Sequence, residues 1–192
     1  LGRIGCPCGI ARAAAGAMIE LSASVEIAAP APRVWEILVD LGRFSAWNPF
    51  IRRAAGSVEL GGEVRVRVAT RAGLLVPLAA RVVRRDEGRE LVWRGHVLSP
   101  RFASGEHAFV LEPAGDGRCR FVQHERFEGA LPRLFGGVLE RETRRGFEAM
   151  NAALAREAER AAGASPREGR APRAAGRASA EDRPRGTSDA SR

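Results

Sequence analysis

The chain has 192 residues, of which 45% are hydrophobic and 28% charged, which is enough for one domain of ordinary size with a buried core. No apolar run approaches the roughly 20 residues of a membrane-spanning helix, so we expect no integral membrane association. The net charge of the chain is +8, which suggests nucleic-acid binding. Residues 18–160, however, contain 22 arginines and 19 acidic residues, so this part of the chain has a net charge of only +3. We therefore expect no specific nucleic-acid partner for the domain.

Residues 1–17 are rich in small residues and lack the continuous apolar core of a secretion signal, so we expect them to be a non-native or disordered extension. The domain is predicted to span residues 18–162. Its first element is a strand over 22–28, in which Val25 and Ile27 alternate with polar residues. Two prolines end this strand, and Pro32 suits the first turn of a helix predicted over 31–40.

The segment 43–50, RFSAWNPF, is aromatic and contains a proline, which predicts a short helix or a loop. Alternating apolar residues then predict strands over 64–68, 76–85, 90–98, 105–112 and 118–127, the last two joined by the hairpin loop 113–117. A helical stripe that includes Phe135, Val138, Phe147, Met150 and Leu154 predicts a long helix over 132–161. Residues 163–192 contain no large apolar residue, so we expect a disordered tail.

This order of elements predicts an α+β fold, in which an antiparallel sheet wraps around the long C-terminal helix. A cavity between sheet and helix is then the expected place for function. Cys6, Cys8 and Cys119 form neither a disulfide framework nor a zinc motif, and no phosphate-binding glycine loop is present. We therefore expect no metal and no cofactor, and a cytoplasmic protein with reduced thiols. All 31 basic residues are arginine, which is typical of a GC-rich bacterial genome.

Four stretches carry a resemblance to the START-like helix-grip superfamily (SRPBCC), within its polyketide cyclase/dehydrase-like branch. They are SVEIAAPAPRVWEILVD at 24–40, FSAWNPF at 44–50, GEHAFVLEPAGDG at 105–117, and FVQHERFEG at 121–129 together with GFEAMNAAL at 146–154. The resemblance implies a helix-grip fold, in which a curved antiparallel sheet of six to seven strands surrounds a long C-terminal helix and two short helices follow the first strand. It also implies a cavity for a small hydrophobic molecule.

Strand parity brings two titratable residues toward this cavity. His107 shares a strand face with Phe109, while Gln123 and Glu125 share one with Phe127. Inward-facing phenylalanines would therefore place His107 and Glu125 inside the cavity as an acid/base pair. The alternative for His107 is a structural role, with its ring held by hydrogen bonds to neighbouring strands.

Other candidate ligand contacts come from aromatic and acidic residues elsewhere in the chain. Trp47 and Phe50 match the family segment near the cavity mouth, where they either gate a ligand or anchor the short helix. Trp93 either fills the core or contacts ligand. Glu142 and Phe147 lie on the apolar stripe of the long helix, and the helix either directs Glu142 into the cavity or rotates it to the rim.

These observations predict a protein that binds a small hydrophobic, lipid-like or polyketide-like molecule, with non-catalytic binding slightly favoured over a cyclase/dehydratase. The alternative function is an interaction module, either a co-chaperone-like or an RNA- or ribosome-associated regulator, in which the arginine-rich tail contacts the partner. We expect a monomer or a weak dimer.

Overall fold

The computed structural model describes residues 18–97, 99 and 101–164. Seven strands and four helical segments follow one another in the order β1 (Ile19–Ile27), α1 (Ala31–Val39), η1 (Leu41–Arg43), α2 (Phe44–Trp47), β2 (Ile51–Gly56), β3 (Glu63–Ala69), β4 (Leu75–Asp86), β5 (Glu90–Val97), β6 (Ala103–Pro113), β7 (Cys119–Glu128) and α3 (Ala130–Ala164). The N-terminal extension and nearly all of the predicted tail lie outside the described residues.

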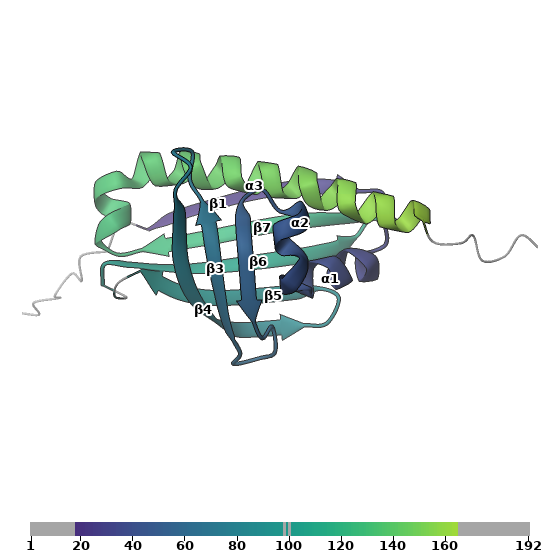
Figure 1. Ribbon diagram of the computed structural model, residues 1–192, viewed down its shortest axis with the longest axis horizontal. Coiled ribbons are helices and arrows are strands. Elements are labelled where there is room, and N and C mark those ends of the chain that lie inside the picture. Colours follow the sequence, from purple (N-terminus) through teal and green to yellow (C-terminus); the bar gives the residue numbers. More distant parts are fainter. Residues whose placement is uncertain (1–17, 98, 100, 165–192) are drawn as a thin grey trace, which may run out of the picture.

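All seven strands form one antiparallel sheet in the order β1-β7-β6-β5-β4-β3-β2. Figure 1 shows β2, β3 and β4 crossing steeply over β5, β6 and β7, so that the sheet curls on itself while α3 runs along its open side. Register shifts in β2 and in β4 mark bulges, which bend and twist strands. This architecture confirms the predicted helix-grip fold.

Two elements differ from the sequence-based expectation. The strand β2 was not predicted, because IRRAAG has a single large apolar residue and its bulge interrupts the alternation. The long helix was predicted, but Phe135 has non-helical backbone angles within it, and Gly136 and Gly137 follow at once. The turns around this break leave Phe135 and Val138 more than half exposed, so the predicted apolar stripe is buried only further along α3.

The two halves of α3 have different partners. Its second half contributes Met150, Leu154 and Ala158 to the main core, where they meet α1 and the middle of the sheet. The helix α1 begins with prolines at its first turn and buries Val34, Trp35 and Leu38 in the same core. The first half of α3 instead covers the part of the sheet where the core gives way to a cavity. No helix among the described residues is long and apolar enough to cross a membrane.

Candidate functional site

A cavity of about 360 Å³ lies between the inner face of the sheet and the first half of α3. Seven of the residues that the sequence singles out line it: Phe50, Trp93, His107, Glu125, Phe127, Glu142 and Phe147. Most of the other lining residues are apolar or small, including Val66, Val68, Leu78, Leu131 and Leu139. The cavity therefore has an apolar wall interrupted at a few places by polar groups, which is the usual character of a small-molecule site.

Three of the sequence candidates lie beside the cavity rather than on its wall. Phe109 is fully buried behind the wall, with its ring centroid 4.1 Å from that of His107 and 5.0 Å from that of Trp93. Trp47 packs edge-on against Phe44 of the same short helix at 5.1 Å and is partly buried against the main core. Gln123 is fully buried between β7 and α3. These three side chains support the site and do not form its surface.

His107 and Glu125 meet because their strands place them directly opposite one another. They are register partners on β6 and β7, and the Nδ1 atom of His107 lies 3.4 Å from Oε2 of Glu125. On its other side, Nε2 of His107 lies 3.1 Å from Oε1 of Gln123. The Phe147 ring stacks on the imidazole with a centroid separation of 4.7 Å. The imidazole is thus fixed on three sides.

The hydrogen bonds of Gln123 determine which nitrogen of His107 carries a proton. The Nε2 amide of Gln123 donates to the carbonyl of Phe147 at 3.3 Å and to Oδ1 of Asn151 at 2.6 Å. Its Oε1 is therefore the acceptor that faces His107, and the His107 Nε2–H donates to it. In the neutral imidazole, Nδ1 is then an acceptor directed at Glu125.

Burial moves the pKa values of both titratable groups in the direction that removes charge. Burial, with a smaller effect from the nearby Glu106 carboxylate, raises the pKa of Glu125 to about 8. Burial is the main reason why the pKa of His107 is lowered to about 3; the hydrogen bond with Gln123 opposes this shift, and the electrostatic effect of His124 adds to it. Near neutral pH the pair is a carboxylic acid beside a neutral imidazole, so Oε2 of Glu125 faces an acceptor to which it can donate.

Two glycines that sequence patterns did not single out line the cavity wall, and one of them makes room for Glu125. Gly95 and Gly105 are register partners on β5 and β6, and both line the cavity. A Cβ atom on Gly105 would lie 2.7 Å from Oε1 of Glu125. The missing side chain therefore leaves room for this second carboxyl oxygen at the cavity wall. A glycine inside a strand is the signal that could have marked this position.

Phe50 occupies the cavity wall through a set of local contacts. Oδ1 of buried Asn48 accepts hydrogen bonds from the backbone N–H groups of Phe50 and Ile51, at 2.9 and 2.8 Å, and this fixes the start of β2. The Phe50 ring then lies directly over Gly146 of α3, in the space that a Cβ atom would take. It meets the Phe147 ring edge-on at 5.9 Å.

At the rim, α3 is tied to the loop between β3 and β4. Oε2 of Glu142 accepts a hydrogen bond from the backbone N–H of Arg71 at 3.2 Å, and Arg145 lies 3.9 Å from the same carboxylate. Glu142 therefore lines the cavity at its edge, where its side chain remains partly exposed. Among the described residues, no group of three or more His, Cys, Asp or Glu side chains could hold a metal ion.

Comparisons with known proteins agree with this architecture. The sequence model of the family described as polyketide cyclase/dehydrase and lipid transport matches residues 18–159. An aromatase/cyclase from Streptomyces sp. R1128 superposes with a TM-score of 0.65 at 24% identity, over 75% of this chain and 95% of that one. A START superfamily protein from Mycobacterium smegmatis gives 0.61 at 20% identity, over 74% and 98% of the two chains.

A norcoclaurine synthase from Thalictrum flavum superposes with a TM-score of 0.60 at 13% identity, over 76% of this chain and 97% of that one. At these identities the likeness shows a shared fold. No curated protein sequence matches the chain significantly.

Proposed function

Since the chain belongs to the polyketide cyclase/dehydrase and lipid transport family, we propose that it binds a small hydrophobic, polyketide-like molecule in the cavity under α3. The observation that carries the proposal is the apolar wall with one buried carboxyl–imidazole pair, Glu125 and His107, at its surface. Two similar folds belong to proteins named as aromatase/cyclases, which supports an aromatic or polyketide-like ligand.

The size of the cavity and the polar groups on its wall support a particular class of ligand. A volume of about 360 Å³ lies at the lower end of the range for small-molecule sites, so a molecule of two or three fused rings fits better than a long acyl chain. Glu125 is the buried acid on the wall, and a protonated carboxyl is a hydrogen-bond donor. The favoured ligand therefore has an apolar ring system and one carbonyl or hydroxyl oxygen that faces Glu125.

Binding is tested with 2-acetylnaphthalene, a bicyclic aromatic ketone, followed by isothermal titration calorimetry. Ala80→Leu places a larger side chain into the cavity from β4, and we expect it to abolish binding. The matched control is Ala108→Leu, because Ala108 has the opposite strand parity to His107 and does not line the cavity. Equal binding by both variants, or no binding by the wild-type protein, would overturn the proposed ligand site.

The Glu125–His107 pair also favours a step beyond binding, namely proton transfer from Glu125 to the ligand. A carboxylic acid with a pKa of about 8 keeps its proton at neutral pH, which suits a general acid. In a dehydration, Glu125 would donate its proton to the departing hydroxyl, which leaves as water. The resulting carboxylate would take the proton from the adjacent carbon, whose C–H electron pair forms the new double bond. Because a carboxylic acid has a single proton, the Glu125 O–H would turn from Nδ1 of His107 to the ligand hydroxyl for this step, and would return to Nδ1 after the product leaves.

This step is tested with 4-hydroxy-4-(2-naphthyl)butan-2-one, a β-hydroxy ketone whose dehydration gives a strongly absorbing conjugated enone. We expect conversion by the wild-type protein, with a rate that falls as the pH rises past about 8 because Glu125 loses its proton. Glu125→Gln should bind the ketone without converting it, whereas Glu128→Gln, an exposed acid on the same strand, should be unaffected. If the wild-type protein binds the ketone and does not convert it, catalysis is refuted and the protein is a carrier.

A further inference from the structure

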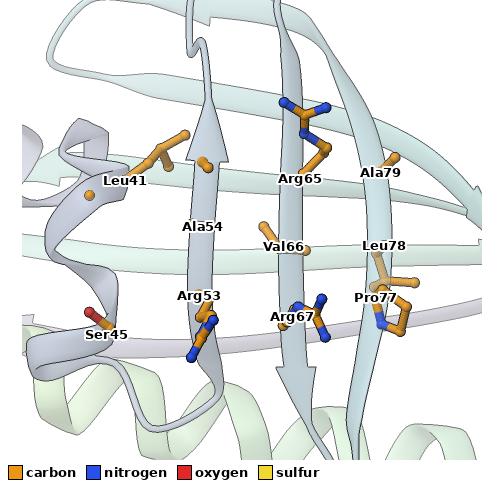
Figure 2. Close-up of a pocket in the computed structure, with 12 residues that line it drawn as sticks. Leu41, Ser45, Arg53, Ala54, Arg65, Val66, Arg67, Pro77, Leu78 and Ala79 are labelled. Atoms are coloured by element: carbon orange, nitrogen blue, oxygen red, sulfur yellow. The ribbon is translucent and has the colours of Figure 1, made fainter.

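A second concave site lies on the opposite face of the sheet from the ligand cavity. It is a groove of about 740 Å³ beside η1 and α2, and its lining includes three arginines, Arg53, Arg65 and Arg67. Figure 2 shows these arginines on the neighbouring strands β2 and β3, with Leu41 and Ser45 on the helical segment to one side and Pro77 on β4 to the other. The valines that alternate with Arg65 and Arg67 point into the protein, which places the arginines on the outer face.

The bulge in β2 brings Arg53 into this groove. Ile51 faces inward opposite Val68, and strict alternation would turn residue 53 inward as well. The register instead shifts by one residue between Ile51 and Arg53, so that Arg53 lies directly opposite Arg67. Bulges of this kind re-aim side chains and are frequent beside functional sites.

The result is an uncompensated cluster of positive charge. Several other outward-facing arginines of the sheet pair with acids, as in the contacts of Arg84 with Glu90 and of Arg94 with Glu106. Among the described residues, neither Arg53 nor Arg67 has a carboxylate within ion-pair distance, while Arg65 has only the exposed Glu63 at 3.6 Å. Like charges placed directly opposite on a sheet destabilise it, so the arrangement has a cost that the fold itself does not offset.

We propose that this groove binds a small molecule that carries a phosphate or diphosphate group, held by Arg53, Arg65 and Arg67. Guanidinium groups donate paired hydrogen bonds that match phosphate oxygens, and Arg53, Arg65 and Arg67 lie close together across two adjacent strands. The small neighbours Ala55, Pro77 and Ala79 leave the space above the sheet free for the ligand. None of the described residues that line the groove is aromatic, so they offer no stacking surface of the kind that a single-stranded nucleic acid uses.

The experiment measures binding of inorganic pyrophosphate to the full chain by isothermal titration calorimetry. Arg53→Gln and Arg67→Gln should each weaken binding about tenfold or more, because each removes a charge-assisted contact. The control is Arg89→Gln, an exposed arginine in the turn between β4 and β5, which should bind like the wild-type protein. The ketone-binding assay of the inner cavity should give the same result for all three variants, which separates this site from the proposed ligand site.

Thermal unfolding provides a second readout. Without ligand, Arg67→Gln should melt about 1–4 °C above the wild-type protein, because it relieves the repulsion with Arg53. Pyrophosphate should raise the melting temperature of the wild-type protein and of Arg89→Gln, but not that of Arg67→Gln. The proposal is overturned by absence of pyrophosphate binding to the wild-type protein, by equal binding to Arg67→Gln and Arg89→Gln, or by binding of only a hexaglutamate peptide or an RNA oligonucleotide.

Discussion

Replacement of Glu125 by glutamine should change how the stability of the protein depends on pH. The pKa of Glu125 is about 8 in the folded protein and near 4.5 in the unfolded chain. Its contribution to stability is fully present below pH 4.5 and is lost as the pH rises through 8, because the folded state alone retains the proton between these values. The loss amounts to about 1.4 kcal/mol for each pH unit within this window.

His107 acts in the opposite direction over part of the same range. Its pKa falls from 6.5 in the unfolded chain to about 3 in the folded protein, so its contribution is present above pH 6.5 and is lost as the pH falls toward 3. The two effects cancel between pH 4.5 and 6.5. Between pH 6.5 and 8 only Glu125 changes, and the wild-type protein should lose about 2 kcal/mol of unfolding free energy.

Urea unfolding at a series of pH values between 5 and 8.5 measures this profile. Glu125→Gln keeps the shape of the side chain but cannot titrate, so its free energy of unfolding should not fall between pH 6.5 and 8. The exposed Glu128 supplies the control, because Glu128→Gln should follow the wild-type profile. Parallel wild-type and Glu125→Gln profiles across this interval would show that Glu125 does not titrate with a raised pKa in the folded protein.

Packing beside the cavity leads to two more predictions. Gly146→Ala should lower the unfolding free energy by about 1–2 kcal/mol, because the new Cβ displaces the Phe50 ring and this cost outweighs the gain in helix propensity. Gly137 faces open space, so Gly137→Ala should raise the unfolding free energy by up to about 1 kcal/mol. Urea titrations of the two variants in parallel compare them, and a more stable Gly146→Ala would contradict the packing. Gln123→Leu should cost about 3 kcal/mol, since it leaves buried Asn151 without its hydrogen bond, and an unchanged midpoint would argue against that bond.

Much of the fold was predictable because its elements have strong local signals. The alternation in β3 to β7 and the buried stripe late in α3 predicted the strands, the helix and their order. Parity also indicated that His107 and Glu125 share an inner face, since a strand has a period of two. The register that places them directly opposite depends on the length of the hairpin between β6 and β7, and the structure supplies it.

Other features depend on contacts between residues far apart in the chain. The tautomer of His107 follows from the hydrogen bond of Gln123 to Asn151 on α3, a partner 28 positions away. The outer groove depends on a one-residue bulge in a strand without a clear apolar pattern. In the sequence, the neighbours of Asn151 and of Arg53 give no sign that Asn151 is buried or that Arg53 lies in a groove. Sequence patterns alone therefore could not single them out.

The proposed function requires that the cavity presents the protonated acid Glu125 to a small hydrophobic ligand. A ¹³C NMR titration of the Glu125 side-chain carboxyl, with and without 2-acetylnaphthalene, tests it directly. We predict a pKa of about 8 in the free protein and a higher value in the complex, because the ligand excludes water from the carboxyl and its carbonyl accepts a hydrogen bond only from the protonated form. An ordinary pKa near 4.5 that the ketone leaves unchanged would contradict the claim.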